Sequence, residues 1–150
     1  MKSKEEKKVY EDYYKRKDSH QTIRYKWYKE KYFKNIKDRK ILEIGCGDGG
    51  VVQYLKQDNE VHAVDISRSA VEFLNSKGIE SYLIDMSVEP LPFNNKTFDD
   101  VIILETLEHL KSPQSTIEEI QRVLKKDGIM IASIPNPRTG HRFIYPSLFE

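Results

Sequence analysis

The sequence has little cysteine and no long apolar run. Cys46 is the only cysteine among 150 residues, so no disulfide can form within the chain. No apolar stretch approaches the roughly 20 residues that cross a bilayer. The N-terminus also lacks the apolar segment of a secretory signal. We therefore expect a cytoplasmic protein in a reducing environment, with no part in a membrane.

Repeats, low-complexity linkers and clusters of metal ligands are missing as well. The length predicts one domain, and 38% hydrophobic with 33% charged residues is typical of a globular chain. No Cys/His cluster has the spacing of a metal site, so we predict no metal.

The net charge of +1 conceals two unlike parts. Residues 1–40 carry 15 Lys and Arg against 7 Asp and Glu, whereas residues 41–150 carry 10 against 17. The first 40 residues also hold six of the nine tyrosines and the single tryptophan. We predict a basic, aromatic helical segment over 1–37 and an acidic core over 38–150.

The core alternates between strand and helix patterns. Two helices are expected over 5–17 and 20–35, and then strands over 40–44, 60–65, 80–84, 98–104 and 128–134. Helices are expected over 51–57, over 69–77 with Ser69 as N-cap and Gly78 as the residue past its end, and from Ser112-Pro113 onwards with a stripe of Ile117, Ile120 and Leu124. This alternation predicts an α/β fold with a parallel sheet, whose ligands bind beyond the carboxyl ends of the strands.

A glycine-rich turn follows the first of these strands. Residues 43–50 read Glu-Ile-Gly-Cys-Gly-Asp-Gly-Gly, and glycines let the backbone turn tightly and approach a ligand. Such turns also occur in dinucleotide enzymes and phosphate loops. Glu43 favours a cationic ligand and would repel a pyrophosphate, and no Gly-Lys-Ser/Thr ending follows. Cys46 lies where a small side chain is required, so we interpret it as a packing residue.

Two further acids end the next two strands. Asp65 could accept both hydroxyls of a ribose, and Asp85 could accept from an adenine amino group. A single aspartate at a strand end is as often a turn or cap residue. Three acids in phase with a glycine-rich turn, Glu43 included, predict a nucleoside-binding crevice.

At this point the chain resembles the class I S-adenosylmethionine-dependent methyltransferases, over roughly residues 38–136. The matching segments occur in the family's order and are residues 43–50, 64–67, 85–86, 90–93, 98–110 and 124–136. The resemblance implies a doubly wound, mostly parallel Rossmann-like sheet, here with five strands after the two N-terminal helices. It also implies S-adenosylmethionine as the cofactor and S-adenosylhomocysteine as the product.

For the methionine end of the cofactor, the resemblance implies five positions. Gly45, Cys46 and Gly47 would pass beneath it, and Glu43 would lie beside it. Glu105, just after the fourth strand, would lie near the methionine and the reaction centre.

For the adenosine end, it implies four more. Asp65 would hold the ribose and Ile66 would pack on the adenine. Asp85 and Met86 would meet the adenine edge, the latter through its backbone amide. Tyr14 is a candidate contact from the N-terminal segment, which would then act as a lid.

The chain departs from the family pattern at its end. The usual fold has seven strands, the last two forming an antiparallel hairpin after strand five. This sequence ends soon after strand five, which indicates a fragment or a shortened member. Strand five would then be a bare apolar edge, and we expect a homodimer through it.

Methyl transfer is a direct displacement that needs no nucleophilic side chain, and a general base is needed only if the acceptor must lose a proton. His109, after the fourth strand, is the candidate base, although it could equally fix a helix start. His141 lies in a loop that could bind an acidic acceptor or simply be solvated. His20 and His62 are interpreted as structural.

Several functions fit these residues. The favoured one is a methyltransferase for a small-molecule acceptor. A methyltransferase for RNA or protein would use the basic N-terminal segment to bind its substrate. A non-catalytic cofactor-binding module is a third reading, and a dinucleotide oxidoreductase, disfavoured by Glu43, is the fourth.

Overall fold

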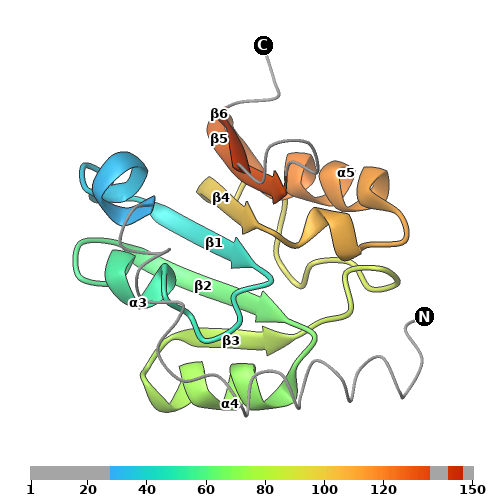
Figure 1. Ribbon diagram of the computed structural model, residues 1–150, viewed down its shortest axis with the longest axis horizontal. Helices are drawn as coiled ribbons and strands as arrows, with labels where there is room; N and C mark the ends of the chain where they lie inside the picture. Colours follow the sequence, from blue (N-terminus) through green and yellow to red (C-terminus); the bar gives the residue numbers. More distant parts are fainter. Residues whose placement is uncertain (1–27, 136–141, 147–150) are drawn as a thin grey trace.

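The computed structural model describes residues 28–135 and 142–146. The predictions for Tyr14, for His141 and for a helix over 5–17 lie outside these residues. The strands of the described residues form a single sheet (Figure 1). Its strands are β1 (Lys40–Ile44), β2 (Glu60–Asp65), β3 (Glu80–Leu83), β4 (Phe98–Leu104), β5 (Leu124–Pro135) and β6 (Arg142–Pro146).

The strands lie in the order β3-β2-β1-β4-β5-β6, and the first five run parallel. Such an order requires crossovers between β1, β2 and β3 on one side and between β4 and β5 on the other. It confirms the predicted parallel α/β sheet, with β1 at its centre.

The prediction of a bare edge at strand five is wrong. β6 pairs antiparallel with β5 from Ile131 opposite Pro146 to Pro135 opposite Arg142. The last residues of β5 therefore have their backbone groups paired within the chain. The reason given for a homodimer through that edge is removed.

The described residues form five helical elements: η1 (Lys29–Phe33), α3 (Val52–Leu55), α4 (Arg68–Ser76), η2 (Leu107–His109) and α5 (Pro113–Val123). The N-cap of α4 is Ser67 and not Ser69, because the Ser67 hydroxyl accepts from the Ala70 backbone N–H at 3.4 Å. Gly78 follows the helix with a φ of +70°, as predicted for its C-terminal stop.

Alternate residues of the central strand feed two separate apolar cores. Ile41 belongs to the face covered by η1, α3 and α4, together with Tyr28 and Phe33. Leu42 and Ile44 belong to the opposite face, which α5 covers. A sheet buried on both sides explains why β1 and β4 read as continuous apolar runs in the sequence.

The buried stripe of α5 differs from the one predicted. Thr116, Ile120 and Val123 are buried, whereas Ile117 is half-buried. Leu124 is buried as the first residue of β5, because the chain enters that strand directly from the helix. In the described part of the chain, no helix is both long enough and apolar enough to cross a bilayer.

Candidate cofactor site

The turn after β1 depends on backbone conformations that favour glycine. Gly45, Gly47 and Gly49 have φ values of +71°, +54° and +71°. A β-carbon at Gly45 would overlap the Thr106 side chain, and one at Gly49 would overlap Leu74. The turn is therefore tightly curved, and the side chains of Thr106 and Leu74 pack closely against its glycines.

Glu43 lies beneath this turn, with 3% of its surface exposed. Its Oε2 accepts a hydrogen bond from the Val52 backbone N–H at 3.1 Å, at the start of α3. Burial raises the pKa of Glu43 to about 8. The nearby Asp48 and Asp65 add to this rise, and the Val52 hydrogen bond opposes it. The site thus holds a carboxyl group that a cationic ligand would help to ionise.

Asp65 connects the turn to the start of α4. Its Oδ2 accepts from the Gly47 backbone N–H and its Oδ1 from that of Ser67, both at 2.8 Å. A carboxylate oxygen can accept more than one hydrogen bond, and both oxygens of Asp65 lie at the turn. Ile66, the next residue, is half-buried and presents an apolar side chain beside it.

Asp85 and Met86 follow β3 and are both buried. Asp85 Oδ1 accepts from the Ser87 backbone N–H at 3.1 Å, and the Asp85 backbone N–H donates to Glu89 Oε1 at 2.8 Å. The Met86 carbonyl accepts from the Thr116 hydroxyl at 3.4 Å. The segment after β3 is therefore fixed on both sides of these two residues.

Glu105 follows β4 directly in a left-handed conformation, with a φ of +51°. This conformation is uncommon for a residue with a side chain. The Glu105 backbone N–H donates to the Ser133 carbonyl of β5 at 2.9 Å. The sharp change of direction brings the next residue, Thr106, against Gly45.

The strand register gathers the predicted residues at one edge of the sheet. Ile44 lies opposite Val64 on one side and Ile103 on the other, and Asp65 lies opposite Leu83. The residues that follow these positions therefore leave the sheet at the same edge. They are Gly45, Cys46 and Gly47 from β1, Ile66 from β2, Asp85 and Met86 from β3, and Glu105 from β4.

Cys46 and His109, two further predicted residues, differ from each other in burial. Cys46 is 1% exposed, and burial raises the pKa of its thiol well above the ordinary value, as a packing role requires. The His109 side chain is 53% exposed at the end of η2, with its Nε2 3.9 Å from Glu108 Oε1. His109 is therefore largely open to solvent, unlike the buried acids.

The set of hydrogen-bond acceptors fits a nucleoside that carries a cationic group. Glu43, Asp65 and Asp85 offer buried carboxylate oxygens, which suit hydroxyl, amino and ammonium donors and repel phosphate. A methyltransferase-domain family matches residues 42–132, the span that contains these three acids. The chain belongs to the class I S-adenosylmethionine-dependent methyltransferases. S-adenosylmethionine is therefore the cofactor that these residues have to accommodate.

This methyltransferase-family chain is similar to proteins from several organisms. Uncharacterized protein MJ1123 of Methanocaldococcus jannaschii is 38% identical over 93 residues, which are 62% of this chain and 43% of that protein. The ubiquinone biosynthesis O-methyltransferase of Rickettsia canadensis is 31% identical over 110 residues, which are 70% of this chain and 46% of that protein. The chain spans less than half the length of these curated relatives.

Solved structures share the fold. The PH0226 protein of Pyrococcus horikoshii superposes with a TM-score of 0.74 at 26% identity, over 85% of this chain and 67% of that one. Coclaurine N-methyltransferase, crystallised with N-methylheliamine and S-adenosylhomocysteine, superposes with a TM-score of 0.63 at 22% identity, over 75% of this chain and 34% of that one.

Sequence reasoning missed residues that support the site from outside. Thr106 fills the space in front of Gly45, and Thr116, Glu119 and Arg122 of α5 bind the segment after Met86. The spacing of the latter three, at i, i+3 and i+6, places them on one side of a helix and is visible in the sequence. Their partners are backbone groups, which a sequence pattern does not identify.

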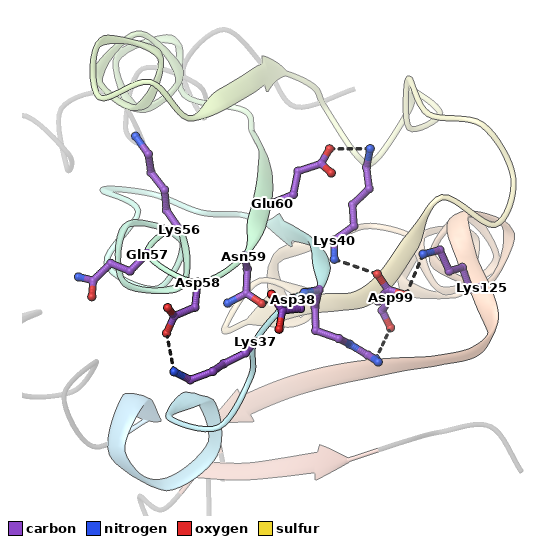
Figure 2. A pocket seen from close by; sticks show the side chains of 11 residues that line it. Lys37, Asp38, Lys40, Lys56, Gln57, Asp58, Asn59, Glu60, Asp99 and Lys125 are labelled. Carbon is purple, nitrogen blue, oxygen red and sulfur yellow. Dashed lines mark hydrogen bonds and ion pairs between the residues drawn. The ribbon is translucent and has the colours of Figure 1, made fainter.

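A surface hollow of about 850 Å³ lies at the opposite edge of the sheet, where β1, β2 and β4 begin (Figure 2). Six of its charged side chains form three ion pairs with one another. The ion pairs are Lys37 with Asp58 at 3.2 Å, Lys40 with Glu60 at 2.7 Å and Lys125 with Asp99 at 2.8 Å. The hollow is therefore a self-paired polar surface, and the candidate cofactor residues lie at the other end of the strands.

Proposed function

We propose that this methyltransferase domain binds S-adenosylmethionine at the carboxyl edge of its sheet and transfers the methyl group to a small-molecule acceptor. One observation carries the proposal: the buried carboxyl groups of Glu43, Asp65 and Asp85 follow one another along β1, β2 and β3 beside a glycine-rich turn. This set of acceptors matches an ammonium group, a ribose and an adenine amino group in turn.

Each residue binds through chemistry that it already has in the fold. Asp65 accepts from the ribose hydroxyls through its carboxylate oxygens. Ile66 packs on the adenine ring, and Asp85 with the Met86 backbone amide meets its polar edge. Gly45, Cys46 and Gly47 pass beneath the methionine part, with Glu43 beside it.

When bound, the cofactor supplies a methyl group on a positively charged sulfur. The chain contributes orientation, because the turn and the acids fix the methyl group relative to the acceptor side. Glu105 lies beside the methionine part at the end of β4. His109 takes a proton from the acceptor where the reaction requires that loss.

The names of two similar proteins support a small acceptor. One is a ubiquinone biosynthesis O-methyltransferase, and another is a coclaurine N-methyltransferase. The described core also carries no added recognition domain between its strands. The basic segment over 1–37 then serves as the lid of the site, with Tyr14 against the cofactor.

Calorimetric titration of the purified chain with S-adenosylhomocysteine tests the proposal. We expect binding by the parent, and an affinity at least about tenfold lower for Asp65→Asn, which weakens charge-assisted hydrogen bonds to the ribose. Asp58→Asn makes the same change at the opposite edge of the sheet, so its affinity should match the parent's. His109→Ala should also keep the parent's affinity, because His109 lies on the acceptor side.

Two results would contradict the proposal. The first is a folded parent chain, by circular dichroism, that does not bind the compound. The second is equal binding by the parent and Asp65→Asn. Binding of a reduced nicotinamide cofactor in its place would instead favour an oxidoreductase.

A further inference from the structure

The segment between β3 and β4 runs from Ile84 to Thr97 without a strand or an α-helix. Its second and third residues, Asp85 and Met86, are the two assigned to the adenine edge. Leu91 is nevertheless only 3% exposed, and it packs in the core on the α5 side of the sheet. Because Leu91 is buried, the backbone N–H and C=O groups of this loop need hydrogen-bond partners within the protein.

One side of α5 supplies those bonds. Glu119 Oε2 accepts from the Leu91 backbone N–H at 2.8 Å. Arg122 donates to the Leu91 carbonyl at 2.9 Å and to the Phe93 carbonyl at 2.7 Å. One turn earlier on the helix, the Thr116 hydroxyl donates to the Met86 carbonyl. Both ends of the stretch 86–93 are thus bonded to the same helix.

Glu119 and Arg122 also hold each other. Arg122 Nε donates to Glu119 Oε1 and Nη2 to Glu119 Oε2, both at 2.8 Å, so the guanidinium binds the carboxylate in a bidentate manner. The Arg122 hydrogen bond lowers the pKa of Glu119 and so keeps it ionised. The pair presents a fixed acceptor and fixed donors to the loop.

An aromatic cluster anchors the far end of the same stretch. The Phe93 ring meets Phe98 edge-on at 4.8 Å and Tyr82 at 5.3 Å between centroids. His62 lies 5.7 Å from Phe93, which gives this buried histidine a packing role. The loop cannot shift along the sheet without breaking either the ring contacts or the bonds to α5.

We propose that Thr116, Glu119 and Arg122 are positioning residues that set the shape of the adenine-side loop and so determine how the site discriminates between purines. The inference rests on the proposed function, because it assigns the adenine edge to Asp85 and Met86. Those two residues recognise the purine, and the α5 side chains hold the backbone from which they project. Loosening that backbone weakens the contact with the 6-amino group more than the contacts with ribose and methionine.

The test compares two ligands that differ at one purine position, S-adenosylhomocysteine and S-inosylhomocysteine, on four forms of the full chain. Arg122→Lys keeps the charge and loses the forked donors, and Glu119→Gln loses the bidentate pair. Glu118→Gln is the matched control, because it makes the same change on the same helix at an exposed side chain that accepts a hydrogen bond from Gln114 and none from the loop. Calorimetry gives the ratio of the two dissociation constants for each form.

We expect the parent and Glu118→Gln to prefer the adenine compound with the same ratio. That ratio should fall about tenfold in Arg122→Lys and Glu119→Gln. Each substitution removes charged hydrogen bonds that hold the loop of Asp85 and Met86, which contact the 6-amino group. Hydrogen exchange of the amides over 86–95 should accelerate in the same two variants. A general loss of stability would instead weaken both ligands equally and leave the ratio unchanged.

An unchanged ratio in folded Arg122→Lys and Glu119→Gln would overturn the inference and leave the proposed function intact. Faster exchange over 86–95 with that unchanged ratio would also overturn it, since the loop would move without affecting the purine. A parent chain that bound neither compound would overturn both proposals, and its own titration reveals this before any variant is made.

Discussion

The Thr106 side chain occupies the space in front of Gly45 that a β-carbon would need. Gly45 opens the turn after β1, and Thr106 follows the left-handed Glu105, the first residue after β4. The Thr106 hydroxyl donates to the Leu104 carbonyl at 3.0 Å. Gly45 and Thr106 lie 61 residues apart in the sequence, and their loops are fitted to each other at the methionine end of the site.

Gly45→Ala should destabilise the fold and abolish binding of S-adenosylhomocysteine. The substitution forces a left-handed alanine and drives its β-carbon into Thr106, so we expect a loss of about 3 kcal/mol in urea unfolding. Gly78→Ala is the control, because its φ of +70° is similar but its nearest neighbour is the flexible Lys56 ammonium at 3.2 Å. That variant should lose about 1 kcal/mol. Equal losses in the two variants would show that the Thr106 contact has no effect.

Glu43 should make the stability of the chain depend on pH. Its pKa of about 8 in the folded chain exceeds the ordinary 4.5, so the folded state holds this proton more tightly than the unfolded state. The stabilisation is complete below a pH of about 4.5 and is lost as pH rises through about 8.

Glu43→Gln, which stays neutral, removes this dependence. Relative to the variant, the parent should lose up to about 1.4 kcal/mol of unfolding free energy for each pH unit between those limits. Urea unfolding of both forms across this range measures the difference. Two curves with the same slope would contradict the prediction.

Arg39 should be needed to keep Asp100 in the core. Its Nε and Nη2 donate to the two carboxylate oxygens of Asp100 at 2.9 and 2.8 Å, and Asp100 is only 3% exposed. Arg39→Met would leave the buried Asp100 carboxylate without its ion-pair partner. We expect the free energy of unfolding to fall by about 3 kcal/mol. Lys37→Met breaks the exposed pair with Asp58 and should change stability by less than about 1 kcal/mol. Similar effects for both substitutions would refute the difference in burial as the cause.

Patterns with a short period in the sequence predicted the fold well. The strand over 60–65 and the strand over 98–104 have the bounds that were predicted, because an apolar run between polar residues is a local signal. The Asp65 position at the end of a strand follows from the same signal. By contrast, the choice of Ser67 over Ser69 as N-cap depends on which hydroxyl reaches the Ala70 N–H.

Contacts between residues far apart in the sequence were harder to predict. β6 was not predicted, since Arg142–Pro146 is too short and irregular to be recognised as a strand and gains its partners from β5. The stripe of α5 was shifted because the helix ends one residue before Leu124. Thr116, Glu119 and Arg122 carry helical spacing, but only the folded chain brings the backbone of Leu91 and Phe93 within their reach.

By itself, the sequence determined the class of the fold, the glycine-rich turn and the acids at the strand ends, because each of these depends on neighbours within a few residues. The tertiary structure decided how the turn is supported. Thr106 against Gly45, Glu43 beneath Val52 and α5 against the loop after Met86 join residues that are far apart along the chain. Such contacts depend on the register of a parallel sheet, which forms only when all its strands and crossovers pack together.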